Sequence, residues 1–153
     1  MHKNIGPALK NTKTLIHVRD ELIKLFKTTK KKNGISKIGY VAGIITSDGP
    51  KHFEINRKRL ADYARALRKI HKFPVFSSVD VFSKEVYTRL AEMVFSFEKR
   101  EVKFRLFWRE ILKSGHVTDI FMTPRWDKSK GATDEHKTAK KIGLTIHYIS
   151  EEK

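Results

Sequence analysis

The hydrophobic pattern of the chain alternates between two kinds of segment. Short apolar runs rich in β-branched and aromatic residues are typical of strands. The run at residues 38–46 is almost wholly apolar, which predicts a central strand buried on both faces. Longer segments in which apolar residues recur every three or four positions are typical of helices. The strand-like runs are residues 38–46, 73–82, 117–123 and 144–149, and the helix-like segments are residues 51–71, 84–113 and 132–142. The second helical segment fits one long helix or two in tandem, and the predicted order is β-α-β-α-β-α-β.

This order predicts an α/β fold. Strands joined by helices of this length run parallel, with right-handed crossovers and helices on both faces of the sheet. We therefore expect a Rossmann-like or flavodoxin-like open parallel sheet of four to five strands. In such sheets ligands bind at the carboxyl ends of the strands, where the connecting loops gather. Three loops are predicted at that edge, namely residues 43–49, 77–82 and 123–136.

The N-terminal part of the chain is more basic than the rest. Residues 1–39 hold ten Lys or Arg and two acidic residues, whereas residues 40–153 hold 23 and 15. The length of the chain favours a single hydrophobic core. We interpret residues 1–35 as a basic N-terminal helical extension and linker, and residues 36–153 as one α/β domain.

The extension contains an amphipathic pattern. Residues 14–26 have helical spacing, Lys30, Lys31 and Lys32 follow, and Asn33-Gly34 predicts the end of the helix. Such a helix docks either on the domain or on a partner. The lysine run either contacts a phosphate backbone or another anionic surface, or it is a solvated linker.

Composition excludes several kinds of chemistry. The chain has no cysteine, so disulfides, zinc–thiolate sites and cysteine nucleophiles are absent. His52, His116, His136 and His147 fall on separate predicted elements without carboxylate support, so we expect no metal and no cofactor. No apolar stretch approaches the roughly 18 residues that span a bilayer, and the N-terminus lacks the apolar segment of a secretory signal. We therefore expect a soluble cytoplasmic protein with no membrane partner.

The loop "DKSKGATDEH", residues 127–136, carries the most suggestive chemistry. Gly131 lets the backbone approach a ligand, Ser129 adds a hydroxyl donor, and the helix N-terminus that follows presents unpaired N–H groups, a combination that suits a phosphate. Glu135 follows about one turn later, where a carboxylate can act as a nucleophile or as an acid or base. The alternative is a glycine-containing turn whose acidic residues only complement the helix dipole.

Two stretches resemble a known superfamily. "YVAGIITSDG", which begins at Tyr40, and "TDIFMTPRWDKSKGATDEHKTAKKIGLTIHYI" are similar to motifs of the nucleoside 2-deoxyribosyltransferase-like superfamily. That group includes the 2'-deoxynucleoside 5'-monophosphate N-glycosidases and a large uncharacterised branch. The resemblance covers about residues 38–149 in order and spacing, and it includes the element Ser-x-Gly-x-x-x-Glu at residues 129–135.

The resemblance implies roles for several residues. Ser129 and Gly131 would hold the 5'-phosphate, and Glu135 would attack the anomeric carbon of the sugar. A carboxylate beneath the sugar stabilises the oxocarbenium-like transition state and can capture it as a glycosyl ester. Many relatives carry a second acid in the preceding helix, and Glu110 is the nearest counterpart here.

Other positions match the motifs less closely. Tyr40 and Gly43 belong to the first loop region, where the backbone would approach the base or sugar. Ile44 stands in place of the usual proline and restores an amide donor, and Arg125 stands in place of a glycine. Arg125 either neutralises a phosphate as a forked donor or fills the pocket. Trp126 either stacks on a nucleobase or pins its loop to the core.

The resemblance therefore implies an N-glycosidic bond hydrolase or transferase that acts on (deoxy)nucleoside 5'-monophosphates through a Glu nucleophile. The resemblance also implies a homodimer, because relatives commonly complete their clefts across a dimer. A different class stays open: a non-catalytic protein that binds nucleotides in the same cleft, or nucleic acid through its basic N-terminal arm.

Overall fold

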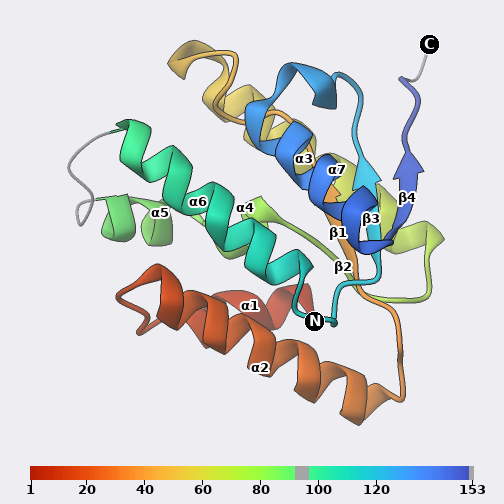
Figure 1. The fold of residues 1–153 in the computed structure, drawn as a ribbon. Helices are drawn as coiled ribbons and strands as arrows, with labels where there is room; N and C mark the ends of the chain where they lie inside the picture. The colour runs from red at the N-terminus through yellow and green to blue at the C-terminus, as the bar shows by residue number, and fades with distance from the viewer. Residues whose placement is uncertain (92–96, 152–153) are drawn as a thin grey trace.

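Strands and helices alternate along the chain in the computed structural model, which describes residues 1–91 and 97–151 (Figure 1). The strands are β1 (Gly39–Ala42), β2 (Val75–Ser77), β3 (Asp119–Met122) and β4 (Thr145–Tyr148). The helices are α1 (His2–Leu9), α2 (Leu15–Asn33), α3 (Phe53–Ile70), α4 (Ser78–Val81), α5 (Lys84–Ala91), α6 (Phe97–Leu112) and α7 (Lys130–Ile142). Short 3₁₀ turns at Pro50–His52 and Trp126–Lys128 precede α3 and α7.

The four strands form one parallel sheet in the order β2-β1-β3-β4. In the central strand β1, Val41 pairs with Ser77 of β2 and with Phe121 of β3. Every residue of β1, β2 and β3 is buried, and for β1 this is what its almost wholly apolar run predicted. The predicted open parallel α/β sheet is therefore confirmed.

Helices cover both faces of the sheet. On one face, Leu60 of α3 packs with Val41 and Phe121 of the sheet. On the other face, α6 packs against α7, and α2 lies alongside α6 (Figure 1). The ring of Phe26 in α2 is 5.2 Å from the ring of Phe76 in β2. The second helix of the chain therefore reaches the sheet itself.

The N-terminal helices contribute to the main hydrophobic core. Ile5 and Leu9 of α1 and Val18, Leu22 and Phe26 of α2 are fully buried in that core. Of the two arrangements that the amphipathic pattern allowed, the structure shows α2 docked on the domain.

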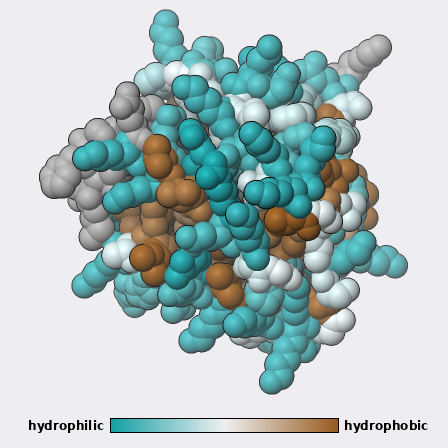
Figure 2. All heavy atoms as spheres, in the orientation of Figure 1, coloured by the Kyte–Doolittle hydropathy of each residue, from teal (hydrophilic) through white to brown (hydrophobic). Residues whose placement is uncertain are grey.

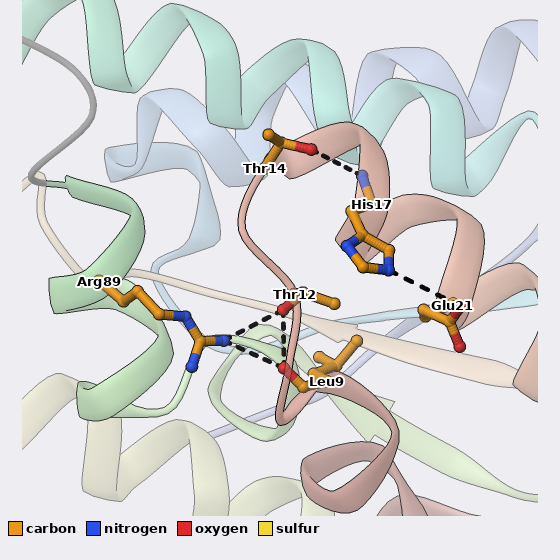
Figure 3. Close-up of polar contacts among 6 residues, drawn as sticks. All are labelled: Leu9, Thr12, Thr14, His17, Glu21 and Arg89. Carbon is orange, nitrogen blue, oxygen red and sulfur yellow. Dashed lines mark hydrogen bonds and ion pairs between the residues drawn. The ribbon is translucent and has the colours of Figure 1, made fainter.

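Polar contacts also tie the turn between α1 and α2 to α5 (Figure 3). Arg89 of α5 donates through Nη2 to the Leu9 carbonyl at 3.0 Å and to Thr12 Oγ1 at 3.1 Å. Thr12 Oγ1 in turn donates to the Leu9 carbonyl at 2.7 Å. Thr14 caps α2, because its hydroxyl oxygen accepts from the His17 amide at 3.1 Å. These contacts fix the direction in which α2 enters the core.

The predicted helix ends after Asn33 and Ile142 are confirmed. Gly34 has φ 61° and closes α2, and Gly143 has φ 80° and closes α7. These left-handed conformations are readily adopted by glycine, which has no Cβ atom to clash with the backbone.

Helix α1 was not predicted by the sequence pattern. Gly6 and Pro7 lie inside it, and both residues have low helix propensity. The burial of Ile5 and Leu9 is a tertiary contribution that outweighs this local preference.

Two further segments differ from expectation. The strand predicted at residues 73–82 ends at Ser77, where a capping box between Ser77 and Asp80 starts α4. Of the two possibilities for residues 84–113, the structure shows separate helices α5 and α6, and the stretch 92–96 between them lies outside the described residues.

Hydrophilic side chains cover most of the face shown in Figure 2, with hydrophobic residues in patches between them. Large apolar side chains that are exposed include Ile16 at 63 % and Leu106 at 47 %. Across residues 1–91 and 97–151, no helix combines the length and the apolar character that crossing a membrane requires.

Candidate functional site

A cavity of about 150 Å³ lies beside the carboxyl ends of the strands. Its lining residues are Tyr40, Gly43, Ile45, Thr46, Ser47, Phe53, Arg57, Ser78, Phe82, Tyr87, Arg100, Glu101, Phe104, Arg105, Trp108, Ser129, Lys130, Gly131, Ala132 and Glu135. They come from β1, from the segments that follow β1, β2 and β3, and from α6. The Lys130 amide donates to Ser47 Oγ at 3.2 Å, which joins the first and third loops. The structure thus brings together the three loops that the predicted topology placed at one edge.

Glu135 is a buried carboxyl group in the wall of this cavity. It lies in the second turn of α7, and the residue is 7 % exposed. The Tyr40 hydroxyl, from the central strand, donates to Glu135 Oε1 at 2.9 Å. Tyr40 is itself buried and stacks on Trp108, with ring centroids 4.7 Å apart. The position of the carboxyl group is therefore fixed by a donor that has little freedom to move.

Burial changes the protonation of this pair. Loss of contact with water raises the pKa of Glu135 from 4.5 to about 8; the Tyr40 hydrogen bond opposes the shift, and the charge of Asp134 adds to it. Burial, followed by the charge of Glu135, raises the pKa of Tyr40 well above 10.0. Near neutral pH, Glu135 is therefore mostly protonated and Tyr40 remains a donor. Carboxyl groups perturbed in this way in a cavity are characteristic of functional sites.

The first turn of α7 borders the same cavity. Ser129 is the N-cap, and its Oγ accepts from the Ala132 amide at 3.1 Å. With the Lys130 amide donating to Ser47, the Gly131 amide has no acceptor in the described part of the chain. An N–H group directed from a helix N-terminus, next to the Lys130 side chain, is a favourable site for an anion.

Aromatic rings form a second part of the lining. Tyr87 lies between Phe53 and Phe104, with centroid distances of 6.2 Å and 5.5 Å, and the Tyr87 and Phe104 rings are stacked. Phe82 is 4.9 Å from Phe104 and 5.8 Å from Trp108. We call these five residues the aromatic wall. Flat apolar surfaces of this kind stack well on a nucleobase.

Positive charge surrounds the cavity. Arg57 of α3, Arg105 of α6 and Lys130 of α7 all contribute to its lining. Glu101 and Glu135 are its two carboxyl residues within the described ranges. Because Glu135 is mostly neutral near pH 7, the lining carries a net positive charge, which favours an anionic ligand.

Gly43 is required by the packing behind the cavity. A Cβ atom at this position would lie 2.2 Å from Oγ1 of Thr123, and that hydroxyl donates to the Ala42 carbonyl at 2.8 Å. At Gly131, by contrast, the nearest atom to an added Cβ is Ser129 Oγ at 3.9 Å. The first glycine therefore serves close packing, and the second has open space around it.

We expect Gly43→Ala to destabilise the protein by about 1–3 kcal/mol, because the added methyl group would overlap the buried Thr123 side chain. Gly131→Ala is the matched control and should be neutral or stabilising by up to about 1 kcal/mol, since alanine is the better helix former. Urea denaturation measures both free energies of unfolding. Equal losses in the two variants would contradict the packing argument.

Glu110, expected as a second acid, does not reach the cavity. It pairs with Arg19 of α2, its side chain is 52 % exposed, and it lies at a separate apolar groove between α2 and α6. In this fold Glu110 joins two helices and does not line the cavity that contains Glu135.

Arg125 and Trp126 also lie outside the cavity lining. Arg125 has φ 66°, its side chain is half exposed, and one of its Nη atoms is 3.8 Å from a carboxylate oxygen of Asp48. Trp126 stacks on His136, with centroids 4.2 Å apart. Ile44 is buried at 6 % exposure. Of the expected site residues, the structure brings together Tyr40, Gly43, Ser129, Gly131 and Glu135.

Sequence reasoning missed the contribution of α3. Arg57 lies four residues after the start of α3, and Glu135 lies five residues after the start of α7. Both helices follow a strand whose carboxyl end borders the cavity. A search for charged residues about one turn into such helices would have identified Arg57, whereas no sequence signal pointed to the aromatic wall as a unit.

The described residues contain no group of three or more His, Asp or Glu side chains placed to hold a metal ion. A family model described as a domain of unknown function (DUF4406) matches residues 97–148. This span contains α6, β3, α7 and β4, and thus Ser129, Gly131 and Glu135, but not β1 with Tyr40. No curated protein and no solved structure matches the chain.

Proposed function

We propose that this protein cleaves the N-glycosidic bond of (deoxy)nucleoside 5'-monophosphates, or transfers their sugar, with Glu135 as nucleophile. The observation that carries the proposal is the buried Glu135 carboxyl group, held by Tyr40 in a cavity next to the N-terminus of α7. The resemblance to the nucleoside 2-deoxyribosyltransferase-like superfamily supports it, because Ser129, Gly131 and Glu135 occupy the motif positions and line one cavity.

The substrate's three chemical parts each find a suitable region. The 5'-phosphate would bind the Gly131 amide and Ser129 hydroxyl, with Lys130 and Arg105 supplying positive charge. The base would contact the aromatic wall. The sugar would then lie between them, with its anomeric carbon facing Glu135.

In the first step, a Glu135 carboxylate oxygen bonds to the anomeric carbon while the bond to the base nitrogen breaks. The electron pair of that bond stays on the base, which takes up a proton. In the second step, water or an acceptor base attacks the same carbon and loses a proton to solvent, while the ester bond breaks and releases Glu135 as a carboxylate. The Tyr40 hydroxyl stabilises the charged form of Glu135 before and after each cycle.

Protonation of the leaving base calls for a second acid. Since Glu110 lies outside the cavity, we propose that Glu101, the other carboxyl residue of the lining, passes a proton from solvent to the leaving base. Glu101 lies one turn before Phe104 on α6, so it borders the aromatic wall where the base would lie.

The test is a screen of nucleosides and their 5'-monophosphates for release of free base. The reactions are run between pH 6 and 9, and chromatography detects the base. We expect release from one or more monophosphates. The kcat/KM should rise with pH until about pH 8, because the attacking form is the carboxylate of a group whose pKa is about 8. Glu135→Gln should abolish release, whereas Glu110→Gln, which changes an exposed carboxylate outside the cavity, should leave it intact.

Binding without release across the whole panel would overturn the catalytic proposal in favour of a nucleotide-binding protein. Equal loss of release in the Glu110 and Glu135 variants would also contradict it, because the two carboxyl groups lie in different surroundings.

A further inference from the structure

Arg57 lies beside the aromatic wall, at the end of the cavity where the nucleobase would bind. One of its Nη1 hydrogens is donated to the Phe82 carbonyl at 3.0 Å, and its guanidinium carbon lies 5.6 Å from the centroid of the Phe53 ring. Both partners belong to the aromatic wall. Two anchors of this kind fix the plane and the position of the guanidinium group beside the rings.

Among the side chains that the structure describes, in residues 1–90 and 99–151, no carboxylate forms an ion pair with Arg57. Glu54, whose charge acts on Arg57, forms its ion pair with Lys84 at 2.9 Å. Burial lowers the pKa of Arg57, and the charge of Glu54 partly opposes this shift. A partly desolvated cation that lines a cavity favours a ligand that brings hydrogen-bond acceptors.

The remaining donors define which acceptors fit. A guanidinium group has five N–H bonds and accepts none. With one Nη1 hydrogen used, Nε and Nη2 of Arg57 still present two parallel donors on one edge. Two adjacent acceptors on a flat ring match this fork, and O6 and N7 of a 6-oxopurine are such a pair. Adenine replaces O6 with an amino donor, which would face the guanidinium unfavourably.

We infer that Arg57 and the aromatic wall form a base subsite selective for 6-oxopurines, so that the preferred ligands are guanine and hypoxanthine nucleotides. This inference rests on the proposed function, because it takes the cavity to be a nucleotide site. It deepens that function by naming the base. The ring would stack on the aromatic wall while its O6 and N7 accept from Arg57.

The test measures binding and base release separately. Calorimetric titration of the Glu135→Gln protein with GMP, IMP, AMP and CMP, in ribose and deoxyribose forms, gives affinities without turnover. We expect GMP and IMP to bind about 10- to 100-fold more tightly than AMP and CMP, the range for one bidentate arginine contact. Guanosine and adenosine should show the same ratio at lower affinity.

Arg57→Lys in the Glu135→Gln protein keeps the positive charge but removes the two parallel donors. It should abolish the preference for GMP and IMP, while nucleotides should still bind more tightly than nucleosides. Arg59→Lys is the matched control on the same helix, since Arg59 lies in a different surface groove, and it should leave the preference unchanged. Circular dichroism checks that each variant is folded.

Two outcomes would overturn the inference. One is equal affinity of the unsubstituted subsite for GMP and AMP. The other is that Arg57→Lys weakens the binding of every nucleotide equally and leaves the affinity for guanosine unchanged. That result would mean that Arg57 contacts the phosphate. A preference for GMP and IMP without any release of base would contradict the catalytic proposal and support the base subsite.

Discussion

Replacing Glu135 with glutamine is expected to slow base release by at least about a thousandfold and to make the folded protein more stable at pH 9. The loss of activity follows from the proposed role, because a neutral amide cannot form the glycosyl ester. The gain in stability follows from burial, because an amide avoids the cost of holding a charged carboxylate away from water. The glutamine oxygen can still accept from the Tyr40 hydroxyl.

The sign of the stability effect depends on pH. Below about pH 4.5 the carboxyl group of Glu135 is protonated in both folded and unfolded chains, so it has no linkage effect. Between 4.5 and about 8 the unfolded chain releases this proton while the folded protein keeps it, and stability therefore falls as pH rises. Each pH unit in this window costs about 1.4 kcal/mol. The full cost, about 5 kcal/mol, is present above pH 8.

Thermal and urea unfolding from pH 4 to 9 would measure this difference. We expect Glu135→Gln and the original protein to have similar stability near pH 4 and to diverge steadily above it. Glu110→Gln is the control, because loss of an exposed ion pair costs only about 0–1 kcal/mol. Parallel stability curves for the original protein and Glu135→Gln would show that Glu135 does not carry the raised pKa.

Phe26→Ala is expected to destabilise the protein by about 3–5 kcal/mol. Phe26 is fully buried and lies 5.2 Å, centroid to centroid, from Phe76 of the sheet. Its removal would leave a cavity between α2 and β2. For a chain of this size the expected decrease in Tm is roughly 10 °C.

Ile16→Ala on the same helix is the matched control. Ile16 is 63 % exposed, so its loss should cost less than about 1 kcal/mol. Similar destabilisation by the two variants, or none by Phe26→Ala, would contradict an integral role for α2. An integral role also means that deleting residues 1–34 removes part of the core. Such a deletion would therefore report on folding before it reports on binding to nucleic acid.

The local pattern of the chain was enough to predict the sheet and much of the site. Apolar runs identified the four strands, and helical crossovers required them to be parallel. Ser129 and Gly131 could be placed at a helix start and Glu135 about one turn later, because these relations depend on residues close in sequence. The same topology placed the loop after β1 beside them, as the contact between Ser47 and Lys130 confirms.

The surroundings of each charged side chain depended on residues distant in sequence. Glu110 follows the expected spacing, yet Arg19, which is 91 positions away, holds it outside the cavity. By spacing Arg57 is one of several cations of a helix, and only the fold brings Phe53 and Phe82 to the positions where they fix its guanidinium group. Propensity likewise disfavoured α1, which forms because Ile5 and Leu9 are buried.

By itself the sequence determined the order of the elements, the parallel sheet and the edge at which a ligand would bind, because periodicity and chain connectivity are local properties. Only the tertiary structure decided which acid is buried, what holds it and how its pKa changes. Glu135 of α7 is held by Tyr40 from β1, and Tyr40 in turn stacks on Trp108 from α6. A carboxyl group loses its contact with water only when segments distant in sequence pack around it. The spacing of residues within one helix therefore does not determine its burial or its pKa.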